Sequence, residues 1–263
     1  MGNADAVIAA LRSGHDSLAG FVRGLGDGDL AKPTGASEWD VSQVLSHLGS
    51  GAEINQATLR AAVDGQPNPI ATGFAQSVWA RWDAAGRRER LDWFLRENEA
   101  LVALFESAAP RDDLRIDLGF IPVPVDLKAA GQFRLSEFTL HTWDVRVGFD
   151  ASTTLAADAV PLISPVAERL AGRLGKTEPL GGKKAVIAVT TTAPDSSFTL
   201  DVGAEAVSLA DDPPVQPDGT LTLPAEAWVR LVTGRLRPQY TPAGISATGP
   251  VGLDVLRQVF PGF

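Results

Sequence analysis

The spacing of apolar residues changes after Asp150, and this change constrains the fold more than any other feature of the chain. Before it, apolar residues recur at helical intervals, which predicts helices at about 4–25, from Asp40 onward, at 76–107 and at 127–147. After it, a helix at about 154–174 precedes two further helices and three strand-like segments, at 185–189, 198–202 and 220–223. We therefore expect two domains. Residues 1–150 should form an antiparallel four-helix bundle, and residues 151–263 an α+β domain with a mostly antiparallel sheet.

The composition is that of a globular protein that does not bind nucleic acid. Hydrophobic residues make up 44% and charged residues 21% of the 263 residues, which favours a packed core over disorder. The net charge of −9 and the scattered basic residues exclude the positive patch that nucleic-acid phosphates require. No apolar run approaches the roughly 20 residues that cross a bilayer, and the first residues lack a signal-peptide pattern. We expect a cytoplasmic protein with no membrane partner and no nucleic-acid partner.

Cysteine is absent from the chain. This absence excludes disulfides, thiolate metal ligands and a sulfur nucleophile that belongs to the protein. Any thiol chemistry must therefore use a thiol supplied from outside.

Two of the three histidines lie in segments that can share a metal ion. Glu137 and His141 are spaced i, i+4, so that on a helix their side chains project from one face. Asp40 and Gln43 have the spacing of a capping box, which predicts that a helix begins there. His47 lies beside the apolar stripe of this helix. Two imidazoles and one carboxylate are the ligand set of a catalytic zinc with an open position, and other divalent metals, iron included, accept the same set. The alternative is a hydrogen-bonded core histidine at position 47 and a simple helical ion pair between Glu137 and His141.

Several segments together resemble the mycothiol-dependent maleylpyruvate isomerase family, and the resemblance covers nearly the whole chain. The segments are Trp39-Asp40-Val41 with His47-Leu48, Glu137 to His141 followed by Trp143-Asp144, Gly249-Pro250-Val251, and Phe260-Pro261-Gly262-Phe263. The resemblance implies a DinB-like four-helix bundle followed by a small α+β domain similar to sterol carrier proteins. It also implies a zinc ion held by His47, Glu137 and His141.

In that family mycothiol supplies the thiol, which agrees with the missing cysteine. Zinc with an open position lowers the pKa of a bound thiol, so that a thiolate persists at neutral pH. The thiolate adds to an electrophilic carbon. The adduct then either collapses after bond rotation, which is an isomerisation, or stays attached, which is an S-transfer.

The resemblance also implies a functional arginine in the second domain, at Arg235. A guanidinium at this position could bind a substrate carboxylate through two hydrogen bonds or stabilise an enolate. Alternatively, Arg235 satisfies the terminal carbonyls of the helix before it. Neighbouring Arg230 and Arg237 are weaker candidates for the same role.

Four further residues have interpretations that the sequence leaves open. We interpret His15 as a structural histidine, with a proton shuttle as the alternative. Asp144 either orients a metal ligand or is an exposed helical aspartate. We interpret Trp39 and Trp143 as packing residues rather than as surfaces that contact substrate.

The expected function is that of an enzyme that uses zinc, or another divalent metal, and mycothiol. It would be an isomerase of the maleylpyruvate type or a thiol S-transferase. Its partners would be a small-molecule electrophile and a low-molecular-weight thiol, and we expect a monomer or a homodimer. The alternatives are a non-catalytic protein that sequesters a small hydrophobic compound in its second domain, and a hydrolase that uses zinc-bound water.

Overall fold

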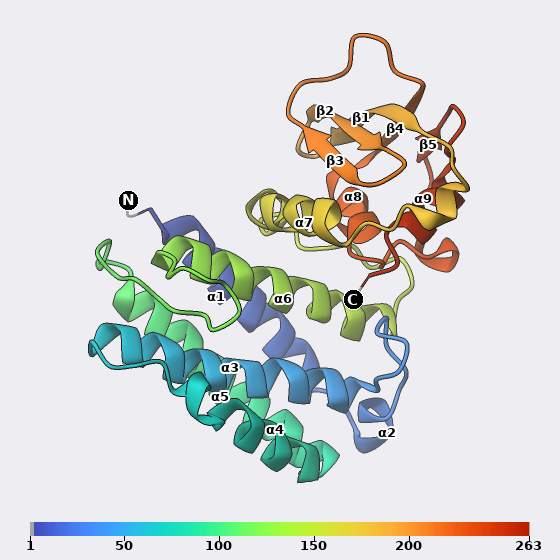
Figure 1. Cartoon of the computed structure of the whole chain (residues 1–263). Helices are drawn as coiled ribbons and strands as arrows, with labels where there is room; N and C mark the ends of the chain where they lie inside the picture. The colour runs from blue at the N-terminus through green and yellow to red at the C-terminus, as the bar shows by residue number, and fades with distance from the viewer. Residues whose placement is uncertain (1–2, 263) are drawn as a thin grey trace. The chain divides into compact units, whose positions relative to one another are not determined.

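The structure is a computed structural model that describes residues 3–262. The chain divides into two compact units, Met1–Asp150 and Ala151–Phe263 (Figure 1). The first unit is helical and the second combines helices with one sheet, which confirms the predicted fold class. Among the described residues, no helix is long and apolar enough to cross a membrane. Phe263, the last residue of the C-terminal motif, lies outside the described range.

Four long helices build the described part of the first unit (Figure 1). They are α1 (Asp5–Val22), α3 (Val41–Val63), α5 (Arg87–Ala108) and α6 (Leu127–Val147). Shorter elements join them, namely α2 (Asp27–Leu30), the 3-10 helix η1 (Pro69–Thr72) and α4 (Phe74–Ala84). The core consists of apolar side chains from all four long helices, among them the fully buried Leu18, Leu45, Phe94 and Phe138. This packing arises because each long helix carries an apolar stripe on the side that faces the others.

The two helices that carry the predicted metal ligands begin at side-chain caps. The Asp40 carboxylate accepts from the Gln43 N–H and the Gln43 side chain accepts from the Asp40 N–H, both at 2.9 Å, which confirms the capping box at the start of α3. Asp126 caps α6 by accepting from the Ala129 N–H at 2.7 Å. Both helices therefore have a fixed starting residue, which sets the face that each ligand occupies.

The prediction of one helix at about 76–107 is wrong, because the chain breaks at Ala85 and Gly86. Ala85 has extended backbone, with ψ 150°, and this ends α4. Gly86 then caps α5, and its N–H donates to the Glu89 carboxylate at 3.4 Å. The break turns α4 back to pack beside α3 (Figure 1).

The strands of the second unit form one mixed sheet in the order β3-β2-β1-β4-β5. The strands are β1 (Ala185–Thr192), β2 (Ser196–Val202), β3 (Val207–Ala210), β4 (Gly219–Pro224) and β5 (Ser246–Ala247). Pairs β1–β2, β2–β3 and β4–β5 are antiparallel, whereas β1 and β4 run parallel. The sheet is therefore mostly antiparallel, as predicted, but the sequence pattern predicts neither β3 nor β5.

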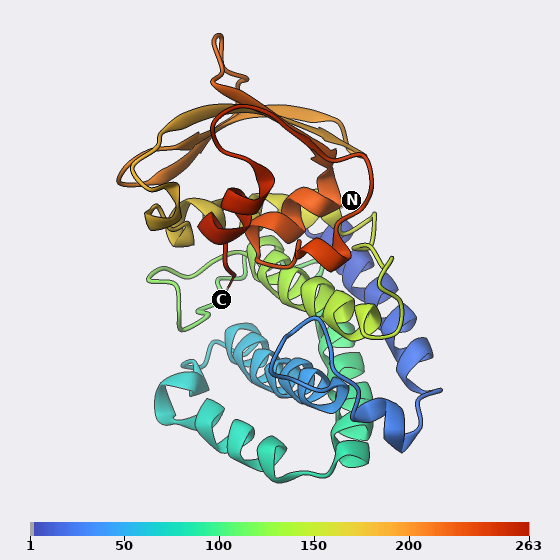
Figure 2. The same ribbon diagram turned by 90° about the vertical axis from the view of Figure 1, so that its right-hand side faces the viewer.

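Helices cover one face of this sheet (Figure 2). They are α7 (Val160–Leu174), α8 (Ala225–Val232) and α9 (Leu253–Val259), with the 3-10 helices η2 (Glu178–Leu180) and η3 (Pro238–Tyr240) between them. Helix α7 begins later than the predicted residue 154. Pro161 lies in its first turn, where a residue without an N–H costs no helical hydrogen bond, so the helix starts there.

Candidate metal centre and adjoining groove

The structure brings the three predicted ligands together in the first unit. His47 projects from α3, and Glu137 and His141 project from consecutive turns of α6. Nε2 of His47 lies 3.2 Å from Oε2 of Glu137, and Nε2 of His141 lies 3.7 Å from the same oxygen. One donor atom from each residue lies within 4.8 Å of the others.

These separations fit a shared divalent ion. Donor atoms about 2.1 Å from a tetrahedral ion lie about 3.4 Å from one another, and the two measured separations, 3.2 and 3.7 Å, lie on either side of this value. The side chains of His47 and Glu137 are 40% and 42% exposed, so an ion held there keeps an open side. This exposure also argues against a core histidine at position 47.

Asp144 contacts one of the candidate ligands. It is fully buried, and its Oδ2 lies 2.9 Å from Nδ1 of His141. Because a carboxylate only accepts, His141 donates to Asp144 through Nδ1, and Nε2 is the nitrogen that faces Glu137. A carboxylate behind a histidine in this way is the usual support of a metal-ligating imidazole. The interpretation of Asp144 as an exposed residue is therefore wrong.

A buried arginine lies on α6 one turn before the candidate ligand Glu137. Arg134, three residues before Glu137 on α6, donates to the Leu48 carbonyl at 2.9 Å and to the Asn98 side-chain oxygen at 2.7 Å. Burial lowers the pKa of Arg134 to about 10, and Glu137 opposes the shift. The guanidinium is therefore charged at neutral pH, and its bonds tie α3 and α5 to α6.

His15 is a structural residue of the same unit, as predicted. It is buried, its Nδ1 lies 2.8 Å from the Asn98 amide nitrogen, and its Nε2 lies 2.9 Å from the Glu99 carboxylate. Asp16 and Glu99 lie close enough to form a second acidic cluster with it. However, Arg12 already pairs with Glu99 at 2.7 Å, so the positive charge of Arg12 compensates the negative charge of this cluster.

The two tryptophans of the family-like segments differ in environment. Trp143 is buried in the bundle, which confirms its packing role. Trp39 is 36% exposed, and its ring centroid lies 5.2 Å from that of His47 and 6.0 Å from that of His141. The ring of Trp39 therefore packs against two candidate ligands and keeps part of its surface exposed.

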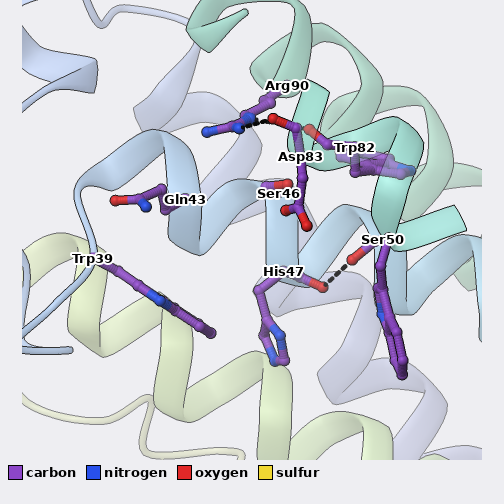
Figure 3. A pocket seen from close by; sticks show the side chains of 9 residues that line it. Trp39, Gln43, Ser46, His47, Ser50, Trp82, Asp83 and Arg90 are labelled. Carbon is purple, nitrogen blue, oxygen red and sulfur yellow. Dashed lines mark hydrogen bonds between the residues drawn. The ribbon is translucent and has the colours of Figure 1, made fainter. Parts of the chain in front are cut away.

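A groove of about 220 Å³ adjoins the centre between α3 and the corner that joins α4 to α5 (Figure 3). Its lining includes Trp39, Gln43, His47, Trp79, Asp83 and Arg90. Sequence reasoning missed the contributions of α4 and α5 because it placed both in one continuous helix. The available signal was Gly86, whose low helix propensity marks the break.

The candidate arginine of the second unit lies just beyond α8. One terminal nitrogen of Arg235 donates to the Thr233 carbonyl at 3.1 Å, and the side chain is half-buried. This bond agrees with the alternative role of Arg235, in which its side chain satisfies a terminal carbonyl of the preceding helix. Arg230 is buried and pairs with Glu226 at 2.7 Å, which is a structural contact. Arg237 is half-buried and lines a separate cavity of about 190 Å³.

Comparisons with known proteins cover both units. Residues 11–146 match the family described as the mycothiol maleylpyruvate isomerase N-terminal domain, and residues 167–241 match the SCP-2 sterol transfer family. The fold is similar to a crystal structure of the mycothiol-dependent maleylpyruvate isomerase, with a TM-score of 0.63, 11% identity, and coverage of 92% of this chain and 91% of that chain. A histidine-to-alanine mutant of that enzyme gives a TM-score of 0.61 at the same identity and coverage. Curated proteins give no match.

Proposed function

Because the chain belongs to the family of the mycothiol maleylpyruvate isomerase N-terminal domain, we propose that it is a metal-dependent enzyme that adds a mycothiol thiolate to an electrophilic small molecule. The reaction is an isomerisation of the maleylpyruvate type or a stable transfer of the thiol. The observation that carries the proposal is the convergence of His47, Glu137 and His141, whose donor atoms lie within 4.8 Å of one another. The missing cysteine supports it, because the nucleophilic sulfur must come from a cosubstrate.

The residues of the centre have separate tasks in this proposal. His47, Glu137 and His141 hold a divalent ion, zinc in the first instance, and Asp144 keeps the Nε2 lone pair of His141 directed at it. When bound, such an ion supplies Lewis acidity that lowers the pKa of a coordinated thiol. The exposed sides of His47 and Glu137 leave room for the sulfur to approach.

Arg235 is proposed as the residue that binds the anionic end of the electrophile. The support is its position in the family pattern, together with the planar, doubly donating shape of a guanidinium. Its bond to the Thr233 carbonyl uses one terminal nitrogen.

Metal content and turnover of matched variants test the proposal. Protein purified without chelators should carry about one divalent ion per chain and should turn over maleylpyruvate only when mycothiol is present. His47→Ala and Glu137→Gln should lose both metal and activity. Asp144→Asn should weaken metal affinity about 10–100-fold, because His141 loses its orienting partner. Glu38→Gln, which alters an exposed carboxylate outside the cluster, is the control.

Two outcomes would contradict the proposal. A His47→Ala protein that is metal-free and fully active would show that the ion has no role in the chemistry. Equal turnover with and without thiol would show that water, and not a thiol, attacks the substrate.

A further inference from the structure

The groove beside the candidate centre begins at a metal-ligand residue. His47 belongs both to the cluster with Glu137 and to the lining of the groove. Figure 3 shows His47 with Trp39 on one side and Ser50 on the other, while Asp83 extends from α4 opposite. If the sulfur of a cosubstrate lies at the centre, the rest of the molecule can therefore extend into the adjoining groove.

The groove presents aromatic surface that the packing of the bundle does not use. Trp79 is 48% exposed and Trp39 is 36% exposed, whereas Trp82, which also lines the groove, is 1% exposed. Exposed tryptophan rings at a cavity offer a rigid apolar face with little conformational entropy to lose on binding. Sugar rings have apolar C–H faces that stack on such surfaces.

Polar groups stand beside these rings. Asp83 provides carboxylate acceptors, Gln43 provides an amide, and Arg90 provides a guanidinium. The Arg90 side chain is held in place by bonds to the main-chain oxygens of Trp82 and Asp83, at 3.1 and 2.7 Å. Hydroxyl groups both donate and accept, so a polyhydroxylated ligand matches this mixture. A ligand with several carboxylates matches it less well, because Asp83 repels them.

We propose that this groove is the subsite for the sugar portion of mycothiol, with Trp79 as its main contact surface and Asp83 as a hydroxyl acceptor. The inference rests on the proposed function, since it takes the sulfur of mycothiol to lie beside His47. The volume of the groove agrees with a site that holds only part of a ligand. Pockets that enclose a whole drug-sized ligand measure about 300–1,000 Å³, and the groove, at about 220 Å³, holds a ring-sized part of one.

Binding of a sulfur-blocked ligand tests the groove separately from the chemistry. S-methyl mycothiol keeps the sugar portion but has no thiolate, and its affinity for the full-length protein can be measured by isothermal titration calorimetry. We expect wild-type protein to bind it, and Trp79→Ala to bind it about tenfold more weakly, as for the loss of a central aromatic contact. Trp79→Phe should retain most of the affinity. Phe120→Ala removes another exposed ring, 68% exposed and outside the groove, and should bind like the wild type.

Kinetics decide which substrate occupies the groove. With mycothiol and maleylpyruvate as substrates, Trp79→Ala and Asp83→Ala should raise the KM for mycothiol about tenfold and leave the KM for maleylpyruvate unchanged. N-acetylcysteine, a thiol without a sugar, should serve wild type and variants equally. A higher KM for maleylpyruvate instead would place the electrophile in the groove, and an equal loss with both thiols would exclude sugar recognition. Both results overturn the assignment.

Failure of this inference is distinguishable from failure of the proposed function. If His47→Ala is metal-free but fully active while Trp79→Ala loses binding of S-methyl mycothiol, the metal chemistry is wrong and the subsite is right. If wild-type protein does not bind S-methyl mycothiol but needs metal and mycothiol for turnover, the subsite is wrong and the chemistry is right.

Discussion

Adding one methyl group at Gly49 should destabilise the first unit, although the same change usually stabilises a helix. A Cβ at Gly49 would lie 2.1 Å from Cη2 and 2.5 Å from Cζ3 of Trp82. Ordinary carbon contacts are about 3.5–4.0 Å, so the ring would have to move by roughly 1.4 Å. It has little freedom to do so, because Trp82 is 1% exposed, donates to Glu53 at 3.0 Å and packs edge-on against Trp93 at 5.3 Å between centroids.

The two opposing contributions give the expected size of the effect. Overpacking of this kind costs about 1–3 kcal/mol, and replacing glycine by alanine within a helix gains about 0.5–1 kcal/mol. Taken from the middle of each range, the net effect of Gly49→Ala is a free energy of unfolding lower by roughly 1–2 kcal/mol. For a unit of this size, the corresponding decrease in Tm is about 2–8 °C.

Thermal unfolding followed by tryptophan fluorescence measures this change. Gly20→Ala in α1 is the matched control, because its new Cβ would meet no heavy atom within 4 Å. That variant should have the same Tm as the wild type or a higher one. If Gly49→Ala and Gly20→Ala raised Tm equally, the packing of Trp82 against α3 would not restrict the ring, and the reasoning would be refuted.

Two other predictions concern His15 and Arg235. Burial lowers the pKa of His15, so between that lowered pKa and about 6.5 the unfolded chain binds a proton that the folded chain does not. The free energy of unfolding of the metal-free protein should therefore decrease as pH falls through this window. His15→Gln should weaken the pH dependence of the urea midpoint. The same change of urea midpoint with pH in both proteins would contradict this. Arg235→Lys keeps the positive charge but loses the planar, doubly donating guanidinium. The kcat/KM for maleylpyruvate should therefore fall about 10–100-fold, with the metal content unchanged. Full activity of this variant would show that Arg235 has no role in the mechanism.

The parts of the site that follow from local sequence were predictable. The capping pair Asp40 and Gln43 fixes the start of α3, and Gly148 marks the end of α6, so the helical faces of these two elements could be assigned. The i, i+4 spacing of Glu137 and His141 then placed both on one face. Each of these inferences needs only residues within one or two turns of each other.

The parts that depend on tertiary packing could not be predicted in the same way. Gly86 is the sequence signal for a break between α4 and α5, but one glycine does not show where the chain turns, and the extended backbone of Ala85 shows two helices there. The groove follows from that break, and therefore its α4 residues were missed. The surroundings of Trp39 are non-local in the same way, since the histidine rings beside it belong to α3 and α6 and are brought to it by the fold.

The same distinction holds in the sheet. Strands β1, β2 and β4 have alternating burial that their sequences predict. Strand β3 has only four residues, and its assignment depends on pairing with β2. The parallel pairing of β1 with β4 is equally non-local, because residues far apart in the chain determine it.

The proposed metal ligands and the main contacts of the proposed sugar subsite lie on different helices. The proposed ligands lie on α3 and α6, whereas Trp79 and Asp83 lie on α4, which supplies none of the three metal-site side chains. Substitutions on the outer helix can therefore alter which cosubstrate is accepted without moving the reactive centre. Natural variation on α4 should accordingly be the simplest evolutionary route by which proteins with this bundle adapt to different small thiols.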